Sequence, residues 1–496
     1  MKGYRPYSPN QAYLLPPSPG EWLPEGHLVY FVLDLVAELN LGPIEQRLQA
    51  KDPRGERPYA PRMMVALLLY GYATGVFSSR RIARATYEDV GFRVLAAGEH
   101  PHFTTVNEFR ATHRAALAGL FLEVLRLCQR AGLVKLGHVA IDGTKMKANA
   151  SKHKAMSYDR MAKVEARLNA EIEALLARAD QTDAAEDAQY GVGQEPEDVP
   201  AELKRRQDRL DKIRAARAAL EREAADARAA ELVGLADELR VTAAAPTTSP
   251  QAAGAAMTLA AQRDQQAAEL DDDDRDPPSP GPDDDLPRHT PPTTPAGAPT
   301  PGAQRNFTDP DSRIMLRDGG FLQAYNAQIA VDDACQIIVA AAVSNQSPDV
   351  EYFEPMLDRI VDNCDGVPDA MTGDAGYFST SNVHAAEHMG TEPFLALARQ
   401  RRNEPQTPAL TSAVPHDARS RMQATLADPR GRAIYARRKA TVEPVFGQIR
   451  AARGFHHFSF RGLWKTRCEW LFVCLTHNLL KLYRATTGAP ADAQFA

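Results

Sequence analysis

Three acidic residues occupy positions where their carboxylates could act together, although they lie far apart in the chain. Asp142 closes a short apolar run, and Asp374 follows the segment Ala-Met-Thr-Gly. The third acid, Glu443, stands alone among cations between Arg437 and Arg450, at what the pattern predicts to be the start of a helix. Carboxylates that hold two divalent ions can support attack on a phosphodiester. We therefore interpret the three acids as a candidate metal site that acts on a DNA backbone.

The chemistry of Mg²⁺ explains why these residue types would be used. This ion prefers oxygen ligands, and it typically takes one or two carboxylates while it keeps waters and a substrate phosphate. The acids come from three distant parts of the chain, so only the fold can bring them together. An acid at a strand end is more often a turn or helix-cap residue, and Asp142 taken alone leaves that alternative open.

Charge is unevenly distributed along the 496-residue chain, whose formal net charge is −6. Residues 269–285 hold nine acids and one Arg, so the rest of the chain carries about +2. Residues 431–470 hold nine Lys or Arg and only two acids, Glu443 and Glu469. The C-terminal third is therefore basic, and the overall acidity does not argue against a nucleic-acid partner.

Cysteine spacing and hydropathy narrow the class of protein. The five cysteines form no CxxC pair, which argues against a zinc ribbon and a disulfide framework. The sequence has no signal-peptide pattern and no apolar run of the roughly 20 residues that span a bilayer. We expect a soluble protein of the reducing cytoplasm.

Apolar periodicity predicts an extended arm at residues 1–23 and an all-helical domain at residues 24–135. Arginines on the polar faces of its short helices could present a helix-turn-helix to DNA, namely Arg80, Arg81 and Arg84. The alternative is that they are solvated on a scaffold or dimerisation module.

The middle of the chain predicts a strand followed by two insertions. Residues 136–151 contain a buried strand that ends at Asp142, after which Gly143 lets the chain turn. Residues 152–240 have helical spacing in two runs, which predicts an antiparallel helical hairpin. Residues 241–305 hold twelve of the 36 prolines and the acidic run, so we expect a disordered, solvated linker. The alternative is an acidic segment that mimics DNA and occupies a basic channel.

Strand patterns dominate after residue 306. Residues 323–331 and 336–343 predict an antiparallel hairpin, and residues 369–373 predict a strand that ends at Asp374. A mostly apolar helix is expected at residues 470–483, packed on the sheet. Residues 306–485 thus complete the catalytic domain, and residues 486–496 form a flexible tail.

Four segments resemble bacterial insertion-sequence transposases of the DDE class, and the likeness runs from about Trp22 to Tyr483. They are Asp142-Gly-Thr-Lys-Met-Lys-Ala-Asn-Ala, Tyr325-Asn-Ala-Gln-Ile-Ala-Val-Asp, Gly373-Asp-Ala-Gly-Tyr-Phe and Val442-Glu-Pro-Val-Phe-Gly-Gln-Ile-Arg. The resemblance implies an α/β fold with a ribonuclease-H-like catalytic core, in which a mixed sheet has flanking helices. Asp142 would lie on its first strand, Asp374 after its fourth, and Glu443 on a later helix. The hairpin and the acidic, Pro-rich segment would interrupt this core, and the all-α domain would precede it.

The resemblance also implies an activity, a cofactor and partners. The three acids would hold two Mg²⁺ ions, for which Mn²⁺ can substitute, and the protein would cut and join DNA at the ends of its element. The partners would be double-stranded DNA, both terminal inverted repeats and target, and a second copy of the chain when it assembles on paired ends. Such a protein would work in the bacterial cytoplasm, at the nucleoid.

Basic residues near the acids are the expected phosphate contacts. Family members often carry a Tyr, an Arg, the Glu and a Lys in one motif. Here Arg450 takes the place of the Lys, while one extra residue after Tyr435 leaves Arg438 and Lys439 as alternatives for the Arg. By charge and position, four further candidates join them: Arg437, Arg453, Lys145 and Lys147.

Two other functions stay open on the sequence alone. The chain could be a DNA-binding regulator that descends from a transposase and is catalytically silent. It could also be a related metal-dependent nuclease that cuts DNA without joining it.

Overall fold

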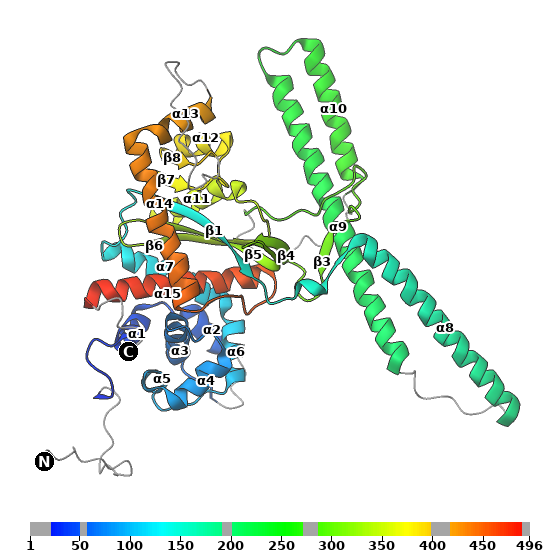
Figure 1. The fold of residues 1–496 in the computed structure, drawn as a ribbon, viewed down its shortest axis with the longest axis horizontal. Coiled ribbons are helices and arrows are strands. Elements are labelled where there is room, and N and C mark those ends of the chain that lie inside the picture. The colour runs from blue at the N-terminus through cyan, green and yellow to red at the C-terminus, as the bar shows by residue number, and fades with distance from the viewer. Residues whose placement is uncertain (1–20, 50–56, 191–200, 271–285, 398–416, 489–496) are drawn as a thin grey trace.

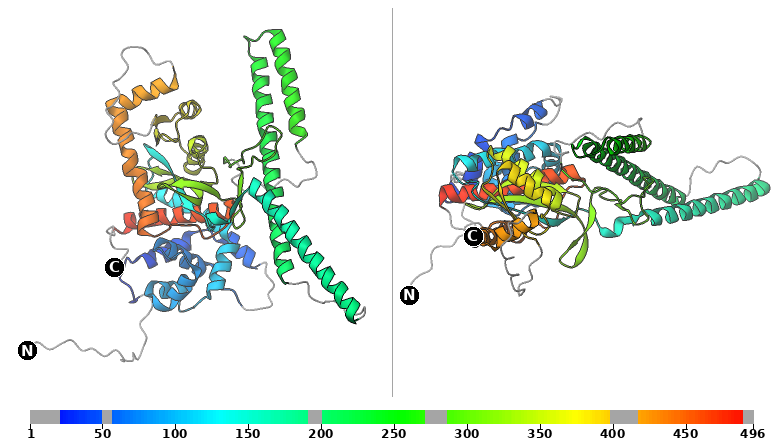
Figure 2. Two further views of the ribbon diagram at one scale, coloured as in Figure 1. Left: turned by 45° about the vertical axis from the view of Figure 1, so that its right-hand side comes forward. Right: turned by 90° about the horizontal axis from the view of Figure 1, so that it is seen from above.

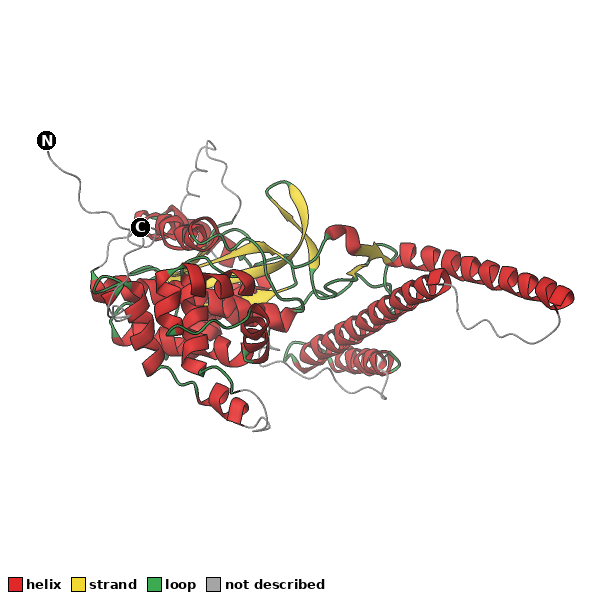
Figure 3. Cartoon of the chain, turned by 90° about the horizontal axis from the view of Figure 1, so that it is seen from below, coloured by secondary structure: helices red, strands yellow, loops and turns green. Residues whose placement is uncertain are grey.

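The computed structural model describes residues 21–49, 57–190, 201–270, 286–397 and 417–488 (Figure 1). These residues form a helical module, a mixed sheet with its covering helices, and a helical arm that stands off to one side (Figure 1, Figure 2). Figure 3 shows the strands lying between the main body of helices and the arm. Within the described ranges, no helix is both long and apolar enough to cross a membrane.

The helical module packs around one central helix. In α3 (Pro61–Ala73), every residue from Met64 onward is buried. Pro61 occupies the first turn, where its missing N–H costs no hydrogen bond. The described residues from Leu28 to Arg130 contain no strand, as their periodicity predicts. The helices around α3 are α1 (Leu28–Glu38), α2 (Gly42–Gln49), α4 (Ser79–Glu88), α5 (Val90–Ala96), α6 (Phe103–Thr112) and α7 (Arg114–Arg130).

The central sheet is organised around β1 (Val139–Lys147). Its strands run in the order β4-β5-β1-β7-β8, and β6 also pairs with β5. β1 is antiparallel to β5 (Gly320–Asp332) along its whole length and parallel to β7 (Ala370–Gly373). β5 and β6 (Ile337–Ser344) form the predicted antiparallel hairpin. The other strands are β4 (Arg313–Arg317), β8 (Glu392–Leu395), and the separate pair β2 (Ala155–Ser157) and β3 (Gln304–Asn306).

The strand that carries Asp142 is longer than predicted. It does not end at the acid, because its pairing with β5 continues to Lys147. Gly143 therefore serves close packing and not a turn: an added Cβ would collide with the Gln328 side chain and lie 2.9 Å from Asp349 Oδ1.

Helices from the C-terminal third cover the sheet. α15 (Leu463–Thr487) lies between the sheet and the helical module, where it contacts β6 as well as α3 and α7 (Figure 1). Trp470 is fully buried in it, and its Nε1 donates to the Gln328 carbonyl at 3.0 Å, so the predicted packing of this helix on the sheet is confirmed. The remaining helices are α11 (Phe353–Cys364), α12 (Thr380–Met389), α13 (Ala418–Ala427) and α14 (Pro429–Gly447), with short η turns at Val350–Tyr352 and Gln448–Ala452.

Glu443 lies near the end of α14, and the prediction that it stands at the start of a helix is wrong. The helix begins earlier because the Asp428 side chain accepts a hydrogen bond from the Arg430 N–H and Pro429 fills the first turn. An acidic cap followed by proline is a usual start signal of a helix.

The arm consists of three helices, α8 (Tyr158–Tyr190), α9 (Ala201–Ala244) and α10 (Pro250–Ala268). α8 and α9 form the predicted antiparallel hairpin. Tyr158 bonds Glu221 and Glu171 pairs with Arg206, so the start of α8 lies against a later turn of α9. The buried apolar residues of their contact are Met161, Leu168, Ile172, Leu210 and Ile213.

The predicted disorder of residues 241–305 is wrong for most of that range. α9 extends to Ala244, and α10 packs antiparallel on it, with an ion pair between Arg240 and Asp264. Ala is the strongest helix former, and Ser249 caps α10 with Pro250 in its first turn, so the Ala-rich run folds as a helix. Leu286 is buried in the core. The acidic run at residues 271–285 lies outside the described residues.

Candidate active site

Asp142 lies on β1, and Asp374 lies near it, directly after the end of the neighbouring parallel strand β7. The two pairs between β1 and β7 are Val139–Met371 and Ala140–Thr372. Each acid stands two residues beyond the second pair, so the same register places one opposite the other. Buried apolar residues fix both strands at this edge, and Asp374 Oδ1 is further held by the Gly376 N–H at 2.8 Å. The two predicted acids from distant parts of the chain are thus brought together.

A third acid, Asp349, belongs to this cluster, and the sequence did not single it out. Its Oδ1 accepts hydrogen bonds from Lys145 Nζ at 3.0 Å, Asn326 Nδ2 at 2.7 Å and Gln328 Nε2 at 2.8 Å. Asp349 is close enough to Asp374 that a Cβ added at Gly376 would meet both side chains. From the sequence it is an ordinary helix-capping acid before residue 350, yet its side chain makes no capping hydrogen bond.

The charges of these acids act on one another. The pKa of Asp142 is raised from 3.8 to about 6, chiefly by burial and also by the nearby charges of Asp374 and Asp349. The Arg438 guanidinium opposes this effect, with its Nη1 3.3 Å from Asp142 Oδ2. Three carboxylates thus lie beside only two cations, Lys145 and Arg438. The excess negative charge favours the binding of a further cation.

Glu443 stands apart from the two aspartates. It is exposed on α14, and the described residues contain no group of three or more His, Cys, Asp or Glu side chains close enough to hold a metal ion. Arg438 lies among the acids: burial disfavours its charge, but the carboxylates of Asp142, Asp374 and Glu443 raise its pKa. In this structure, Glu443 therefore does not form a three-carboxylate metal site with Asp142 and Asp374.

Four of the predicted phosphate contacts lie beside the acids, namely Arg438, Tyr435, Arg450 and Lys145, the last through its pair with Asp349. Arg438 contacts Asp142 and is 8% exposed, whereas Lys439 is exposed, so the geometry places Arg438 at the site. Burial raises the pKa of Tyr435, and the nearby Arg438 guanidinium opposes this rise. Arg450 Nη1 reaches Thr144 Oγ1 at 3.4 Å, one pleat from Asp142 on β1.

The predicted contacts Arg453, Arg437, Lys145 and Lys147 differ in how accessible their charges are. The prediction for Arg453 is wrong, because its buried guanidinium donates to Thr476 Oγ1 at 2.7 Å and burial lowers its pKa to about 10. It fixes α15 and cannot reach DNA. Arg437 pairs with Asp333, and the Lys145 side chain is only 14% exposed in its pair with Asp349. Lys147 is exposed, beyond the acids on β1.

The arginines of α4 are remote from the acids. α4 lies in the helical module, and Figure 1 shows it on the far side of α15 from the sheet. Arg80 stacks over the Phe103 ring at 4.8 Å, Arg84 pairs with Glu88, and Arg81 is exposed. Any DNA contact there would be separate from the acidic cluster.

Comparison with known families gives two matches. The family of the Transposase DDE domain matches residues 300–479, and the family of the Transposase domain (DUF772) matches residues 17–112. Neither curated proteins nor solved structures gave a significant match. These two matches indicate an insertion-sequence transposase of the DDE class. Asp349, Asp374 and Glu443 fall within the first match and Asp142 falls outside both, so its place in the site depends on the β1–β7 pairing.

Transposases of this class normally use a divalent metal, and the residues present fit one. The donors at the site are carboxylate oxygens, which hard cations prefer. Burial is the main cause of the raised pKa of Asp142, to which the charges of Asp374 and Asp349 add, and a bound cation would favour its charged form. Asp142 and Asp374 are the residues that would hold the ion.

The pH dependence of stability tests this electrostatic picture. The pKa of Asp142 is about 6 in the folded protein, above its ordinary value of 3.8. The contribution of Asp142 to the unfolding free energy is therefore greatest below pH 3.8 and is lost as the pH rises through 6. Between pH 4 and pH 7, the unfolding free energy of the parent should therefore fall relative to that of Asp142→Asn by up to roughly 3 kcal/mol. Thermal unfolding across this range measures it, and Mg²⁺ should raise the Tm of the parent alone at pH 7. Parallel pH profiles for the two proteins would contradict the prediction.

Asp349 is expected to contribute stability through its three donors. Asp349→Ala leaves the partly buried Lys145 ammonium and the Asn326 amide without this acceptor, while Gln328 Nε2 keeps its bond to Asn326 Oδ1, and it should lower the unfolding free energy by about 2 kcal/mol. Chemical denaturation measures this loss. The double variant with Lys145→Met should recover part of it, because the unpaired charge is then gone. If the changes in unfolding free energy of the two single variants simply add in the double variant, Lys145 and Asp349 do not interact.

Proposed function

We propose that this protein is a DNA transposase that cuts and joins DNA at the ends of its insertion sequence by a two-metal mechanism. The observation that carries the proposal is the β1–β7 register, which brings Asp142 close enough to Asp374 for their charges to interact, in a chain with a match to a transposase domain. In this proposal the protein works in the bacterial cytoplasm on nucleoid DNA.

The arrangement of strands supports a ribonuclease-H-like core. β1 carries Asp142, and β5, β6 and β7 follow it in the central sheet. If the short strand β4, which precedes β5 and pairs with it, is counted as an addition, Asp374 comes after the fourth core strand. Glu443 lies on the later helix α14, which packs near β1, β5 and β7. The segment from β2 to β3 then forms an insertion between the first two core strands.

Each side chain has a role in this mechanism. Asp142 and Asp374 would hold two Mg²⁺ or Mn²⁺ ions, and Glu443 would join them as the third ligand. When bound, such ions lower the pKa of a water nucleophile and stabilise the leaving oxygen of the phosphodiester. Arg438, Tyr435 and Arg450 would orient the phosphate beside the acids, and the partial burial of Asp142 limits the access of competing water to its carboxylate.

The helical module supports a separate role in DNA binding. Its match to a transposase domain and the surface arginines of α4 support contact with the terminal inverted repeats. In the proposed assembly two copies of the chain hold paired element ends. The freed 3′ hydroxyl of each end then attacks a phosphodiester of the target DNA, and a new P–O bond forms as the target's own 3′ oxygen leaves.

The test is a cleavage and strand-transfer assay. Purified full-length protein, with Mg²⁺ or Mn²⁺, should nick and join DNA that carries the inverted repeats flanking its own gene, and EDTA should abolish both reactions. Metal-dependent cleavage without joined products would instead identify a nuclease. Binding of the repeats without any cleavage would identify a catalytically silent regulator, and the proposal would then be wrong.

A further inference from the structure

A basic pocket lies at the far end of β1 from the acids. It has a volume of about 630 Å³, within the range of roughly 300–1,000 Å³ typical of ligand pockets. Its cations are Lys147, Lys152, Lys154 and Arg461, and no Asp or Glu lines it. None of the four makes an ion pair with a described residue. Burial raises the pKa of Asp309 and the nearby Arg461 opposes this rise, but the three lysines have no such acidic neighbour among the described residues, so the pocket concentrates positive charge.

The backbone around these cations is held in place. Asn149 Nδ2 donates to the Ser459 carbonyl at 2.6 Å, and Arg461 Nε donates to the Asn149 carbonyl at 3.0 Å. Asn306 Nδ2 holds the Ser151 carbonyl at 2.9 Å, just before the short helix η2 (Lys152–Lys154). The exposed lysines thus project from a fixed loop, which lowers the entropy lost when an anion binds.

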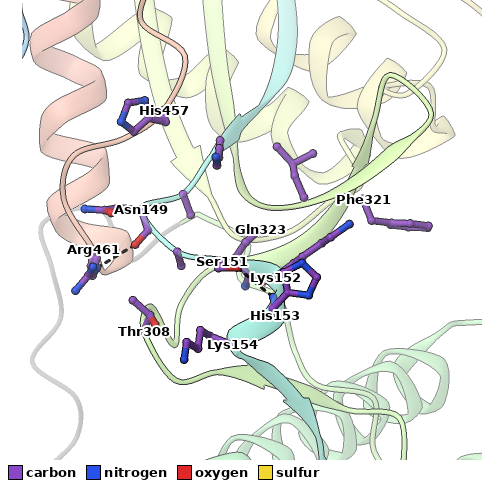
Figure 4. A pocket seen from close by; sticks show the side chains of 14 residues that line it. Asn149, Ser151, Lys152, His153, Lys154, Thr308, Phe321, Gln323, His457 and Arg461 are labelled. Carbon is purple, nitrogen blue, oxygen red and sulfur yellow. Dashed lines mark hydrogen bonds between the residues drawn. The ribbon is translucent and has the colours of Figure 1, made fainter.

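The pocket also offers an aromatic face. Figure 4 shows Arg461 and Phe321 on opposite sides, with Lys152 and His153 between them. Phe321 is 63% exposed, so its ring is open to a ligand in the pocket. An aromatic ring suits a nucleobase, whereas cations alone would suit any phosphate.

We propose that this pocket binds an unpaired stretch of DNA strand, with its phosphates on Lys147, Lys152, Lys154 and Arg461 and a base stacked on Phe321. The inference rests on the proposed function, because it takes the acids as the cleavage site. Five residues of extended β1 separate Lys147 from Asp142, a span of about 17 Å. A strand that leaves the acids along β1 reaches the pocket after a few nucleotides. A duplex could meet the cations, but its stacked bases could not lie on Phe321.

The test measures oligonucleotide binding without metal. A fluorescein-labelled single-stranded 15-mer and its duplex are titrated with full-length protein in EDTA at several salt concentrations, with anisotropy as the readout. The double variant Lys152→Ala, Lys154→Ala should lose single-strand affinity and lower the salt slope of log K by about 1.4. Phe321→Ala should weaken single-strand binding about tenfold and leave duplex binding nearly unchanged.

A charge-matched control comes from the arm. Lys204 and Lys212 are exposed on α9, and their double Ala variant removes the same charge away from the pocket. It should bind as the parent does. Thermal unfolding checks that all variants are folded, as expected for exposed positions. The pocket proposal is overturned if the pocket variants bind the single strand as tightly as the control, or if Phe321→Ala affects both DNAs alike.

Failure of this proposal is distinguishable from failure of the proposed function. Asp374→Asn should retain single-strand binding, because the binding assay contains no metal. A protein that binds through the pocket but never cleaves its element ends would contradict the transposase mechanism alone. Normal cleavage together with unaffected binding by the pocket variants would contradict the pocket alone.

Discussion

Asp374→Asn is expected to reduce metal-dependent cleavage and strand transfer by about a thousandfold, equivalent to roughly 4 kcal/mol of transition-state stabilisation. The substitution removes one of the two carboxylates that the β1–β7 pairing brings together. Asn keeps an oxygen that can accept the Gly376 N–H, so the turn after β7 should persist. Gel assays of nicked and joined products, with the Tm as a check on folding, measure the effect.

The matched control for this variant lies just before the same strand. Asp369 precedes β7 and is exposed at the opposite end from Asp374, so Asp369→Asn removes the same charge at a distance from the acids. It should cleave as the parent does. Because the Asp374 charge raises the pKa of Asp142, Asp374→Asn should also lower that pKa towards its ordinary range. Cleavage by Asp374→Asn at the parental rate would remove this residue from the mechanism.

Glu443→Gln is expected to have the second largest effect, a loss of cleavage of about a hundredfold, or nearly 3 kcal/mol. The substitution keeps the length of the side chain and a comparable helix propensity, so α14 should be intact. In the structure Glu443 is exposed and does not join the aspartates. The size of the loss therefore reports whether α14 moves towards the acids when metal and DNA bind. Single-turnover cleavage and the Mg²⁺ concentration at half-maximal rate are the measurements.

An exposed glutamate of another helix provides the comparison. Glu354 lies in the first turn of α11, and Glu354→Gln should leave cleavage unchanged. If Glu443→Gln behaves like this control, Glu443 is not a ligand. Asp349, which already lies against Asp374, would then be the next candidate for the third carboxylate.

Local sequence patterns predicted much of the fold for identifiable reasons. A continuous apolar run predicted β6, because a strand buried on both faces is rich in apolar residues. Strand-forming residues on either side of a polar turn predicted its pairing with β5. Helical spacing predicted α3, the α8–α9 hairpin and α15. The prediction failed where a long segment has mixed composition: prolines and acids elsewhere in residues 241–305 concealed the Ala-rich run that forms α10.

By itself, the sequence determined which kinds of residue are available and which elements carry them. Residue types and their spacing are enough to predict two aspartates next to strands, one glutamate on a helix and a basic C-terminal third. Only the tertiary structure decided which of these groups meet. Arg438 faces Asp142 while Arg453 is buried under α15, and Asp349 joins the acids through Lys145. Charge and spacing along the chain could not separate these cases, because the contacts join residues whose distance is set by packing and not by sequence.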